Sequence, residues 1–417
     1  MTQTISQKGQ GNPLGYEKLS ALLKGYAIPS IIAMLVSSLY NIVDQIFIGQ
    51  GVGYLGNAAT NVSYPLTTIC LAIALLIGIG SASWFSLELG AGREESAART
   101  VGTAVSMMVI LGILYVAVIE TFLTPLLTIF GATKDVMPYA QSYTRITAAG
   151  MPLLILTNGL SNLARADGSP KYSMTCMLVG AVINTILDPI FIFVLHQGVA
   201  GAAIATVAGQ LFSCLMALYY LKKFRHVKLQ RHHFIPRLHV CGKIASLGMS
   251  SSLNQIAITF VQIVLNNSLT YYGAQSAYGS EIPLASCGIV MKTNAILLAV
   301  IIGISQGSQP IIGFNYGAKQ YERVRGIYRL AITWNLAVSG AGFLLFQLFP
   351  RHIISIFGTG EPLYFEFAIR FLRIFLFMVI INGVQLLSSN FFAAIGKPVK
   401  GVILSLTRQV FFLVPLL

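Results

Sequence analysis

Two aspartates lie inside long apolar runs of this chain, where a carboxylate is costly. Asp44 lies in the run at about residues 26–48, and Asp188 lies in the run at about residues 172–195. An ionisable side chain within a membrane-spanning segment commonly marks an ion or substrate pathway. Both runs cross in the same direction, and both aspartates lie in the outer half at similar depth. The two carboxyl groups can therefore share one cavity and take up a cation or a proton.

Oxygen-bearing groups surround Asp188 in the sequence. Asn184 precedes it by four residues, so the two side chains lie on one face of a helix. Pro189 has no N–H and leaves the carbonyl of Thr185 without its helical partner. Carboxylate, amide and carbonyl oxygens are the ligands that a hard cation prefers, whereas a poorly solvated carboxylate can instead hold a proton. These residues leave both a metal ion and a proton open.

Other polar side chains in the apolar runs have more than one interpretation. Asn158 and Thr206 lie in apolar or Gly/Ala-rich stretches, where such residues act as ligands or as packing contacts between helices. Lys292 can meet an anionic substrate, balance a carboxylate, or extend its long stem to the membrane interface. Four histidines in a basic loop are expected to be solvated or to face lipid headgroups: His226, His232, His233 and His239.

The elements that carry these residues are predicted to be membrane-spanning helices. Hydrophobic residues make up 55% of the 417-residue chain and charged residues 10%, with a mean hydropathy of +0.74. Soluble domains have about a quarter charged residues, so most of this surface must face lipid. A helix needs about twenty residues to span the hydrocarbon layer. Eleven runs meet that length: about 26–48, 62–88, 100–122, 138–161, 172–195, 199–221, 244–271, 282–306, 325–349, 365–389 and 399–417.

Basic residues alternate between the predicted loops. The N-terminal tail and every second loop carry twenty Lys and Arg residues, whereas the loops on the other side carry two, Lys134 and Arg351. This asymmetry is the positive-inside pattern and predicts a plasma-membrane protein with a cytoplasmic N-terminus. The net charge of +14 is therefore assigned to membrane topology. No basic stripe is interleaved with aromatic residues, so nucleic-acid binding is not expected.

The chain repeats itself over about half its length. At a shift of 227 residues Gly90 matches Gly317, and at a shift of 228 Arg145 and Asn162 match Arg373 and Asn390. Internal symmetry of this kind is typical of transporters. The expected division is an N-terminal lobe at residues 1–222, a basic linker at 223–243 and a C-terminal lobe at 244–417, each lobe being one copy of a parallel six-helix repeat. The second copy has only five runs, so we expect a twelfth helix that this chain lacks.

Several other functions lack the residues that they need. The chain contains no G-x-x-x-x-G-K-[ST], H-E-x-x-H or G-x-S-x-G motif. A membrane-embedded lipid-modifying enzyme is a remote alternative, because only Glu88, Glu94 and Glu95 gather near a membrane boundary. The five cysteines form no CxxC pair, so we expect neither a disulfide nor a metal site from them. The sequence predicts a non-enzymatic transporter without a cofactor.

Several segments together resemble the multidrug and toxic compound extrusion (MATE) family of secondary antiporters. The segments are Ile28–Asp44, Leu89–Glu95, Asn184–Pro189, Gln309–Ala318 and Ala394–Pro398. The pattern is most similar to the DinF/MepA-like bacterial branch. This resemblance implies two six-helix lobes around a central cavity. It also implies a monomer that exports cationic, lipophilic compounds in exchange for H⁺ or Na⁺.

The resemblance further implies an acidic centre in the N-terminal lobe. By matching, this centre comprises Asp44, Asn158, Asn184, Asp188 and Thr206, and a Na⁺ ion would lie at Asp188, Asn184 and Thr206. The second lobe has no deeply placed acid, in contrast to another branch of the family, so no coupling site is assigned there. A lipid-linked oligosaccharide flippase of the same superfamily is the alternative, although such proteins usually carry extra helices and a basic cavity.

Overall fold

The computed structural model describes residues 11–279, 281–356 and 362–407, and within these residues the regular elements are helices. Nine of the helices are long and apolar enough to cross a membrane, and a bent pair adds a tenth span. The nine are α1 (Leu19–Val52), α2 (Tyr54–Gly90), α3 (Glu94–Ile129), α4 (Met137–Ala166), α5 (Pro170–Pro189), α6 (Gly198–Tyr220), α7 (Leu238–Ala274), α8 (Glu281–Gly317) and α9 (Tyr321–Leu348). The chain is an all-α polytopic membrane protein.

Most helices extend beyond the predicted runs. The 34 residues of α1 correspond to a length of about 51 Å at 1.5 Å per residue, against about 30 Å of hydrocarbon. The additional turns carry polar residues that hydropathy alone excludes. Shorter elements lie between or after the long helices: η1 (Pro13–Gly15), η2 (Ile190–Val194), η3 (Arg231–Phe234), α10 (Pro350–Ile356) and α13 (Pro398–Leu406).

The tenth predicted span, at about 365–389, is not one continuous helix. It consists of α11 (Pro362–Phe375) and α12 (Val379–Ala394), which meet at a bend of 42°. Two backbone bonds at the break join residues three apart, from Phe377 N–H to Ile374 O and from Val379 N–H to Leu376 O. This tighter winding redirects the helix without proline. Of the eleventh run only its first part, α13, falls within the described residues.

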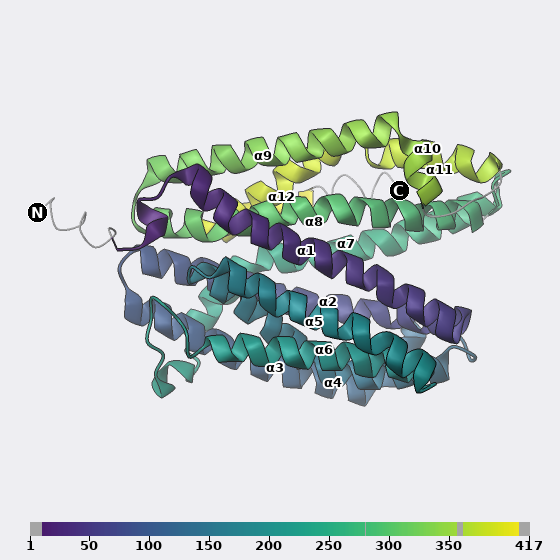
Figure 1. Ribbon diagram of the computed structural model, residues 1–417, viewed down its shortest axis with the longest axis horizontal. Coiled ribbons are helices and arrows are strands. Elements are labelled where there is room, and N and C mark those ends of the chain that lie inside the picture. The colour runs from purple at the N-terminus through teal and green to yellow at the C-terminus, as the bar shows by residue number, and fades with distance from the viewer. Residues whose placement is uncertain (1–10, 280, 357–361, 408–417) are drawn as a thin grey trace, which may run out of the picture.

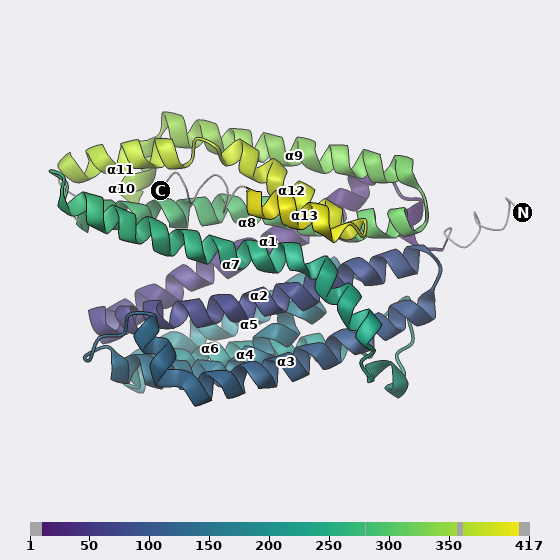
Figure 2. The same cartoon turned by 180° about the vertical axis from the view of Figure 1, so that it is seen from behind.

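The helices form two bundles that exchange their first members (Figures 1 and 2). In Figure 1, α2–α6 lie below and α8–α12 lie above, while α1 crosses diagonally from the upper set to the lower one. Figure 2 shows α7 crossing in the same manner on the other side of the molecule. We call α1–α6 the N-terminal bundle and α7–α13 the C-terminal bundle. The end of the molecule near the N-terminus, where the Lys- and Arg-rich connections lie, is called the basic face.

Glycines allow the two bundles to approach closely in the half nearest the basic face. A Cβ atom on Gly80 of α2 would lie 2.0 Å from the carbonyl oxygen of Ile244, and one on Gly248 of α7 would lie 1.8 Å from that of Leu76. The pair α1 and α8 meets similarly, because a Cβ on Gly307 would lie 2.6 Å from the Cα of Ala27. No larger residue fits these contacts with the backbones in place. The packing of α2 on α7 and of α1 on α8 therefore joins the bundles.

Polar contacts close the same half of the molecule. Gln309 of α8 donates from Nε2 to Ser83 Oγ at 2.6 Å and to the Ile79 carbonyl at 3.3 Å on α2. Still nearer the basic face, a Cβ on Gly90 would lie 2.0 Å from the Phe314 carbonyl oxygen. A Cβ on Gly317 would lie 2.1 Å from the Leu87 carbonyl oxygen. Close backbone contact and buried hydrogen bonds thus seal the bundles together at the basic face.

Candidate functional site

Asp44 of α1 and Asp188 of α5 come together in the N-terminal bundle, on the side away from the basic face. Their carboxyl groups are near neighbours in the interior of the bundle. Asp188 is fully buried, and Asp44 is half-buried. Two carboxyl groups this close favour a cation between them when both are ionised, or otherwise share a proton. The expected proximity of these two residues is present in the structure.

Asn184 links Asp188 to α6. Its amide Nδ2 donates to Asp188 Oδ1 at 3.1 Å and to Thr206 Oγ1 at 3.4 Å. Thr206 in turn donates to the Ala202 carbonyl of its own helix at 3.0 Å. Asp44, Asn184, Asp188 and Thr206 therefore form one cluster across α1, α5 and α6, which we call the acidic cluster.

Small residues bring α5 and α6 close enough for these bonds. A Cβ on Gly209 would lie 2.6 Å from the Gly180 carbonyl oxygen and 3.2 Å from the Cβ of Asn184. One turn further along α6, Ser213 Oγ donates to the Cys176 carbonyl at 2.7 Å. Small and hydroxyl-bearing residues at membrane helix interfaces permit this kind of backbone approach. The position of Asn184 is therefore set by the glycine contact beside it.

This packing yields a prediction about Gly209. We expect Gly209→Ala to separate α5 from α6, because the added methyl group meets the Gly180 backbone at 2.6 Å. The result should be weaker transport although both aspartates remain. Gly242→Ala is the matched control, since no atom lies within 4 Å of a Cβ there. Transport measured at equal expression checks this, and equal activity of the two variants would contradict the positioning role of Gly209.

Three oxygen atoms of the acidic cluster have no hydrogen-bond donor within the described part of the chain. They are Asp44 Oδ1, Asn184 Oδ1 and Asp188 Oδ2, and all three are buried. Buried oxygens normally accept a hydrogen bond or bind a cation, because leaving them unsatisfied costs about 1–3 kcal/mol each. These atoms are the available ligands for a proton or a small cation.

Two tyrosines near the acidic cluster were not predicted. Tyr40 lies one turn before Asp44 on α1, and Tyr143 lies on α4. Both tyrosines are near enough to Asp44 and Asp188 to feel the charge of these carboxyl groups. Tyr143 also packs against a small apolar group formed by Ile48, Ile192 and Ala202. Helical spacing could have identified Tyr40, because residues four apart share a face. Nothing in the local sequence indicates Tyr143.

Asn158 and Lys292 lie apart from the hydrogen bonds of the acidic cluster. Asn158 Nδ2 donates to the Leu154 carbonyl of its own helix at 3.0 Å. It lies about 12 Å from the basic end of α4, whereas Asp188 lies about 27 Å from the basic end of α5. Lys292 is exposed on α8, in the other bundle. Their roles in coupling or substrate binding stay predictions.

Arg165 lies between the predicted runs 138–161 and 172–195 and is one of the twenty loop Lys and Arg residues counted above, but the structure buries it between the bundles. Its side chain is 3% exposed at the end of α4. The Nη1 atom donates to Gln306 Oε1 on α8 at 2.9 Å and to Asn162 Oδ1 at 3.2 Å. These acceptors are neutral amides, and Nε has no acceptor within the described residues. The positive charge of the Arg165 guanidinium therefore lies inside the sealed half, where neutral amide oxygens stabilise it only in part.

A second group of ligand-type side chains lies on the basic face. Glu95 Oε1 lies 3.0 Å from Nε2 of His233 and 3.3 Å from Nε2 of His232. The ligating atoms of all three residues lie within 4.8 Å of one another, as a metal site would require. However, His233 Nδ1 accepts the N–H of Gln230 at 3.0 Å, which places the ring proton on Nε2. That proton faces Glu95, so the group is a hydrogen-bonded contact.

The burial of His233 corrects one expectation from the sequence. His233 is 1% exposed, whereas a solvated or headgroup-facing histidine was expected in this loop. The reason is that η3 docks against α3, where a Cβ on Gly102 would lie 2.3 Å from the His233 carbonyl oxygen.

Glu88 is also buried, and it forms two hydrogen bonds with Arg93, at 2.6 and 2.7 Å. That pairing gives Glu88 a structural role.

Comparison with known proteins identifies the family to which this chain belongs. The MatE family model matches residues 29–190 and 249–416, once in each half of the chain. This chain belongs to the MATE family. A multidrug export protein MepA of Staphylococcus haemolyticus is 26% identical over 404 residues, covering 95% of this chain and 86% of that protein. A probable multidrug resistance protein YoeA of Bacillus subtilis is 25% identical over 397 residues, covering 93% and 82%.

Solved MATE structures have the same fold. A structure described as the outward-facing conformation of a multidrug resistance MATE family transporter of the MOP superfamily superimposes with a TM-score of 0.87. It is 25% identical and covers 98% of this chain and 89% of that one. A MOP superfamily transporter from Pyrococcus furiosus, described as having a binding pocket of reverse polarity, gives 0.86 at 25% identity, with coverage of 98% and 89%. This MATE protein is therefore a membrane transporter, and the enzyme alternative is set aside.

Proposed function

We propose that this MATE transporter is a secondary antiporter that exports cationic, lipophilic compounds from the cell. The acidic cluster supports this, because it places two neighbouring carboxyl groups inside an apolar bundle. A negatively charged, poorly solvated site attracts either a coupling cation or a cationic substrate, but not both at once. Competition for Asp44 and Asp188 would couple the two fluxes. The export proteins similar to this chain carry multidrug names, which agrees with such substrates.

The arrangement of hydrogen bonds favours a proton over Na⁺ as the coupling ion. Asn184 turns its Nδ2, a donor, toward Asp188 and Thr206. Sodium would instead bind the amide oxygen, so the Asn184 side chain would have to turn its Oδ1 toward Asp188 and Thr206. A single proton shared by the two carboxyl groups needs no such rearrangement. Na⁺ at Asp188, Asn184 and Thr206 stays the alternative.

We propose alternating access as the transport cycle. The N-terminal lobe (1–222) and the C-terminal lobe (244–417), joined by the linker at 223–243, would rock against each other. In this structure the sealed half lies at the basic face, where α2 packs on α7 and α1 on α8. With the basic face in the cytoplasm, as the distribution of Lys and Arg supports, the state is closed to the cytoplasm. Opening requires the Arg165–Gln306 and Gln309–Ser83 bonds to break.

Transport by purified protein in liposomes tests this proposal. Ethidium movement is measured under a proton gradient at equal Na⁺, and under a Na⁺ gradient at equal pH. We expect the proton gradient to drive ethidium transport and the Na⁺ gradient to have no effect. Transport driven by Na⁺ alone would overturn the choice of ion. Transport driven by neither gradient, with protein that remains folded, would overturn antiport of this compound class.

A further inference from the structure

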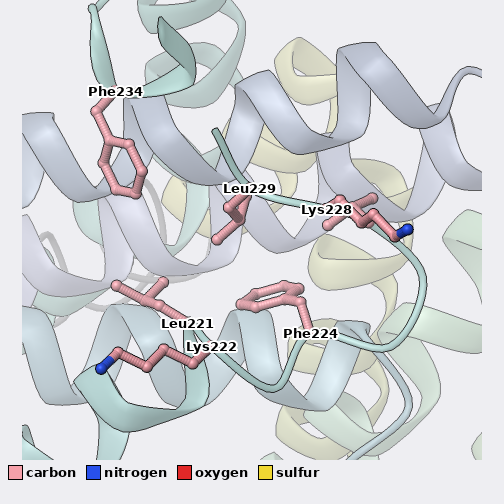
Figure 3. A pocket seen from close by; sticks show the side chains of 7 residues that line it. Leu221, Lys222, Phe224, Lys228, Leu229 and Phe234 are labelled. Carbon is pink, nitrogen blue, oxygen red and sulfur yellow. The ribbon is translucent and has the colours of Figure 1, made fainter. Parts of the chain in front are cut away.

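A pocket lies between the end of α6 and the linker that leads to α7. It has a volume of about 410 Å³ and is lined by Leu221, Lys222, Phe224, Val227, Lys228, Leu229 and Phe234. Figure 3 shows Leu221, Phe224, Leu229 and Phe234 turned toward a common space, with the amino groups of Lys222 and Lys228 at its edges. The pocket therefore has apolar walls and a cationic rim. It is distant from the acidic cluster, which lies toward the opposite face.

The surroundings of the pocket are strongly basic. Residues 221–243 contain seven Lys and Arg residues and no Asp or Glu. Neither Lys222 nor Lys228 belongs to an ion pair in the described parts of the chain. The two acids that contact the linker are Glu95 and Asp167, and both already accept bonds from it. The two lysines are thus free to meet an anion.

Residues of the kinds that gather at a membrane interface surround the pocket. Tyr219, in the last turn of α6, is 53% exposed and carries the Lys223 amino group 4.6 Å from its ring centre. Just beyond the pocket, Ile235 is 67% exposed and Leu238 is 91% exposed, on either side of Arg237. Aromatic, basic and exposed apolar residues gather in this way where a chain meets the membrane interface. A lipid headgroup at that interface would therefore lie beside the pocket.

The walls of the pocket are held in place from both ends of the linker. Asp167 Oδ2 accepts the N–H of Arg225 at 2.7 Å and the hydroxyl of Tyr220 at 2.8 Å. At the other end, Ser106 donates to the Phe234 carbonyl, and His233 contacts Glu95. A site whose walls are fixed in advance loses less conformational freedom when a ligand binds. The linker is therefore suited to hold a ligand.

We propose that this pocket binds an anionic phospholipid. The phosphate would lie against Lys222 or Lys228, and the upper part of an acyl chain would lie along Leu221, Leu229 and Phe234. Basic pockets beside membrane helices on the cytoplasmic side recognise lipid headgroups through this combination of charge and apolar contact. The proposal needs the membrane embedding of the chain but not its transport activity. Its test is therefore independent of the antiport proposal.

Native mass spectrometry of the full chain in detergent tests the proposal, with phosphatidylglycerol and phosphatidylcholine as probes. We expect phosphatidylglycerol to bind, and we expect phosphatidylcholine to bind at least about tenfold more weakly. Lys222→Gln together with Lys228→Gln should weaken phosphatidylglycerol binding about tenfold or more, since each basic residue near the surface contributes about a factor of five. Lys222→Arg together with Lys228→Arg should keep phosphatidylglycerol binding, because both positive charges are retained.

A matched pair of substitutions controls for net charge. Lys24→Gln with Lys171→Gln removes two exposed basic residues of the same face outside the pocket and should leave binding unchanged. Equal losses in both double Gln variants, or equal binding of the two lipids, would overturn a specific site. Binding of sn-glycerol 1-phosphate as strong as that of phosphatidylglycerol would also overturn it, because the apolar walls would then have no part. Thermal unfolding of each variant shows that it is folded.

Discussion

Asp188→Asn should abolish coupled export and leave a folded protein. The substitution preserves the shape of the side chain but removes the carboxyl group that we propose takes up the coupling ion. The Asn184 amide at 3.1 Å can still donate to the new oxygen, so the packing of α5 on α6 should survive. Efflux of ethidium from energised cells, measured at equal expression, should fall to the level of cells without the transporter. Asp44→Asn should behave in the same way, because the two carboxyl groups act as a pair.

The chain offers a matched control for that experiment. Asp135 is an exposed aspartate in the connection between α3 and α4, and Asp135→Asn makes the same chemical change outside the membrane. Efflux should be unchanged in this variant. If Asp188→Asn exports ethidium as well as Asp135→Asn does, the acidic cluster is not the coupling site. Loss of efflux in both variants would indicate a general effect of the Asp-to-Asn change.

Gly248→Ala should have the second large effect, on the seal between the bundles. The new methyl carbon would lie 1.8 Å from the Leu76 carbonyl oxygen and 2.8 Å from its Cα, which are backbone atoms that cannot turn aside. Overpacking of a tight contact costs about 1–3 kcal/mol or more. A shift of about 3 kcal/mol changes the ratio of closed to open states by roughly a hundredfold. Export should therefore fall because the state closed at the basic face is lost.

Gly242→Ala, six residues earlier on α7, separates this effect from helix propensity. No atom lies within 4 Å of a Cβ at Gly242, so the added methyl group there has only its usual benefit of about 1 kcal/mol to the helix. We expect this variant to export normally and to unfold at the same temperature or higher. Gly248→Ala should unfold at a lower temperature. Equal export by both variants would show that closing at the basic face does not need the close contact.

The sequence predicts the long helices and the meeting of the two aspartates for simple physical reasons. Hydropathy over about twenty residues reports the cost of placing a segment in lipid, and that cost does not depend on neighbouring helices. Asp44 and Asp188 each lie a few residues before the outer end of their predicted run. The alternation of basic loops indicates that both runs point outward, so the two aspartates are predicted at similar depth. Depth is a property of one segment, so it can be read locally.

The features that the sequence does not predict depend on which helices pack together. Arg165 was counted with the loop residues, yet Gln306 of α8 reaches it across the bundle interface. His233 is buried because the linker docks on Gly102 of α3. The bend between α11 and α12 involves neither proline nor glycine at the break, so no local residue indicates it. The first two contacts join residues more than a hundred positions apart, and the bend depends on how the helices pack.

The crossing of α1 and α7 between the bundles follows the internal repeat of the sequence. Gly80 and Gly307 are 227 residues apart, and each receives the first helix of the other half, α7 at Gly80 and α1 at Gly307. Likewise, the Gly90 contact with Phe314 mirrors the Gly317 contact with Leu87 under the same shift. An interface in which each partner contributes the same surface is that of a two-fold symmetric dimer. The interface between the bundles therefore has the two-fold pseudosymmetry of a dimer of half-length chains, although both halves belong to one chain.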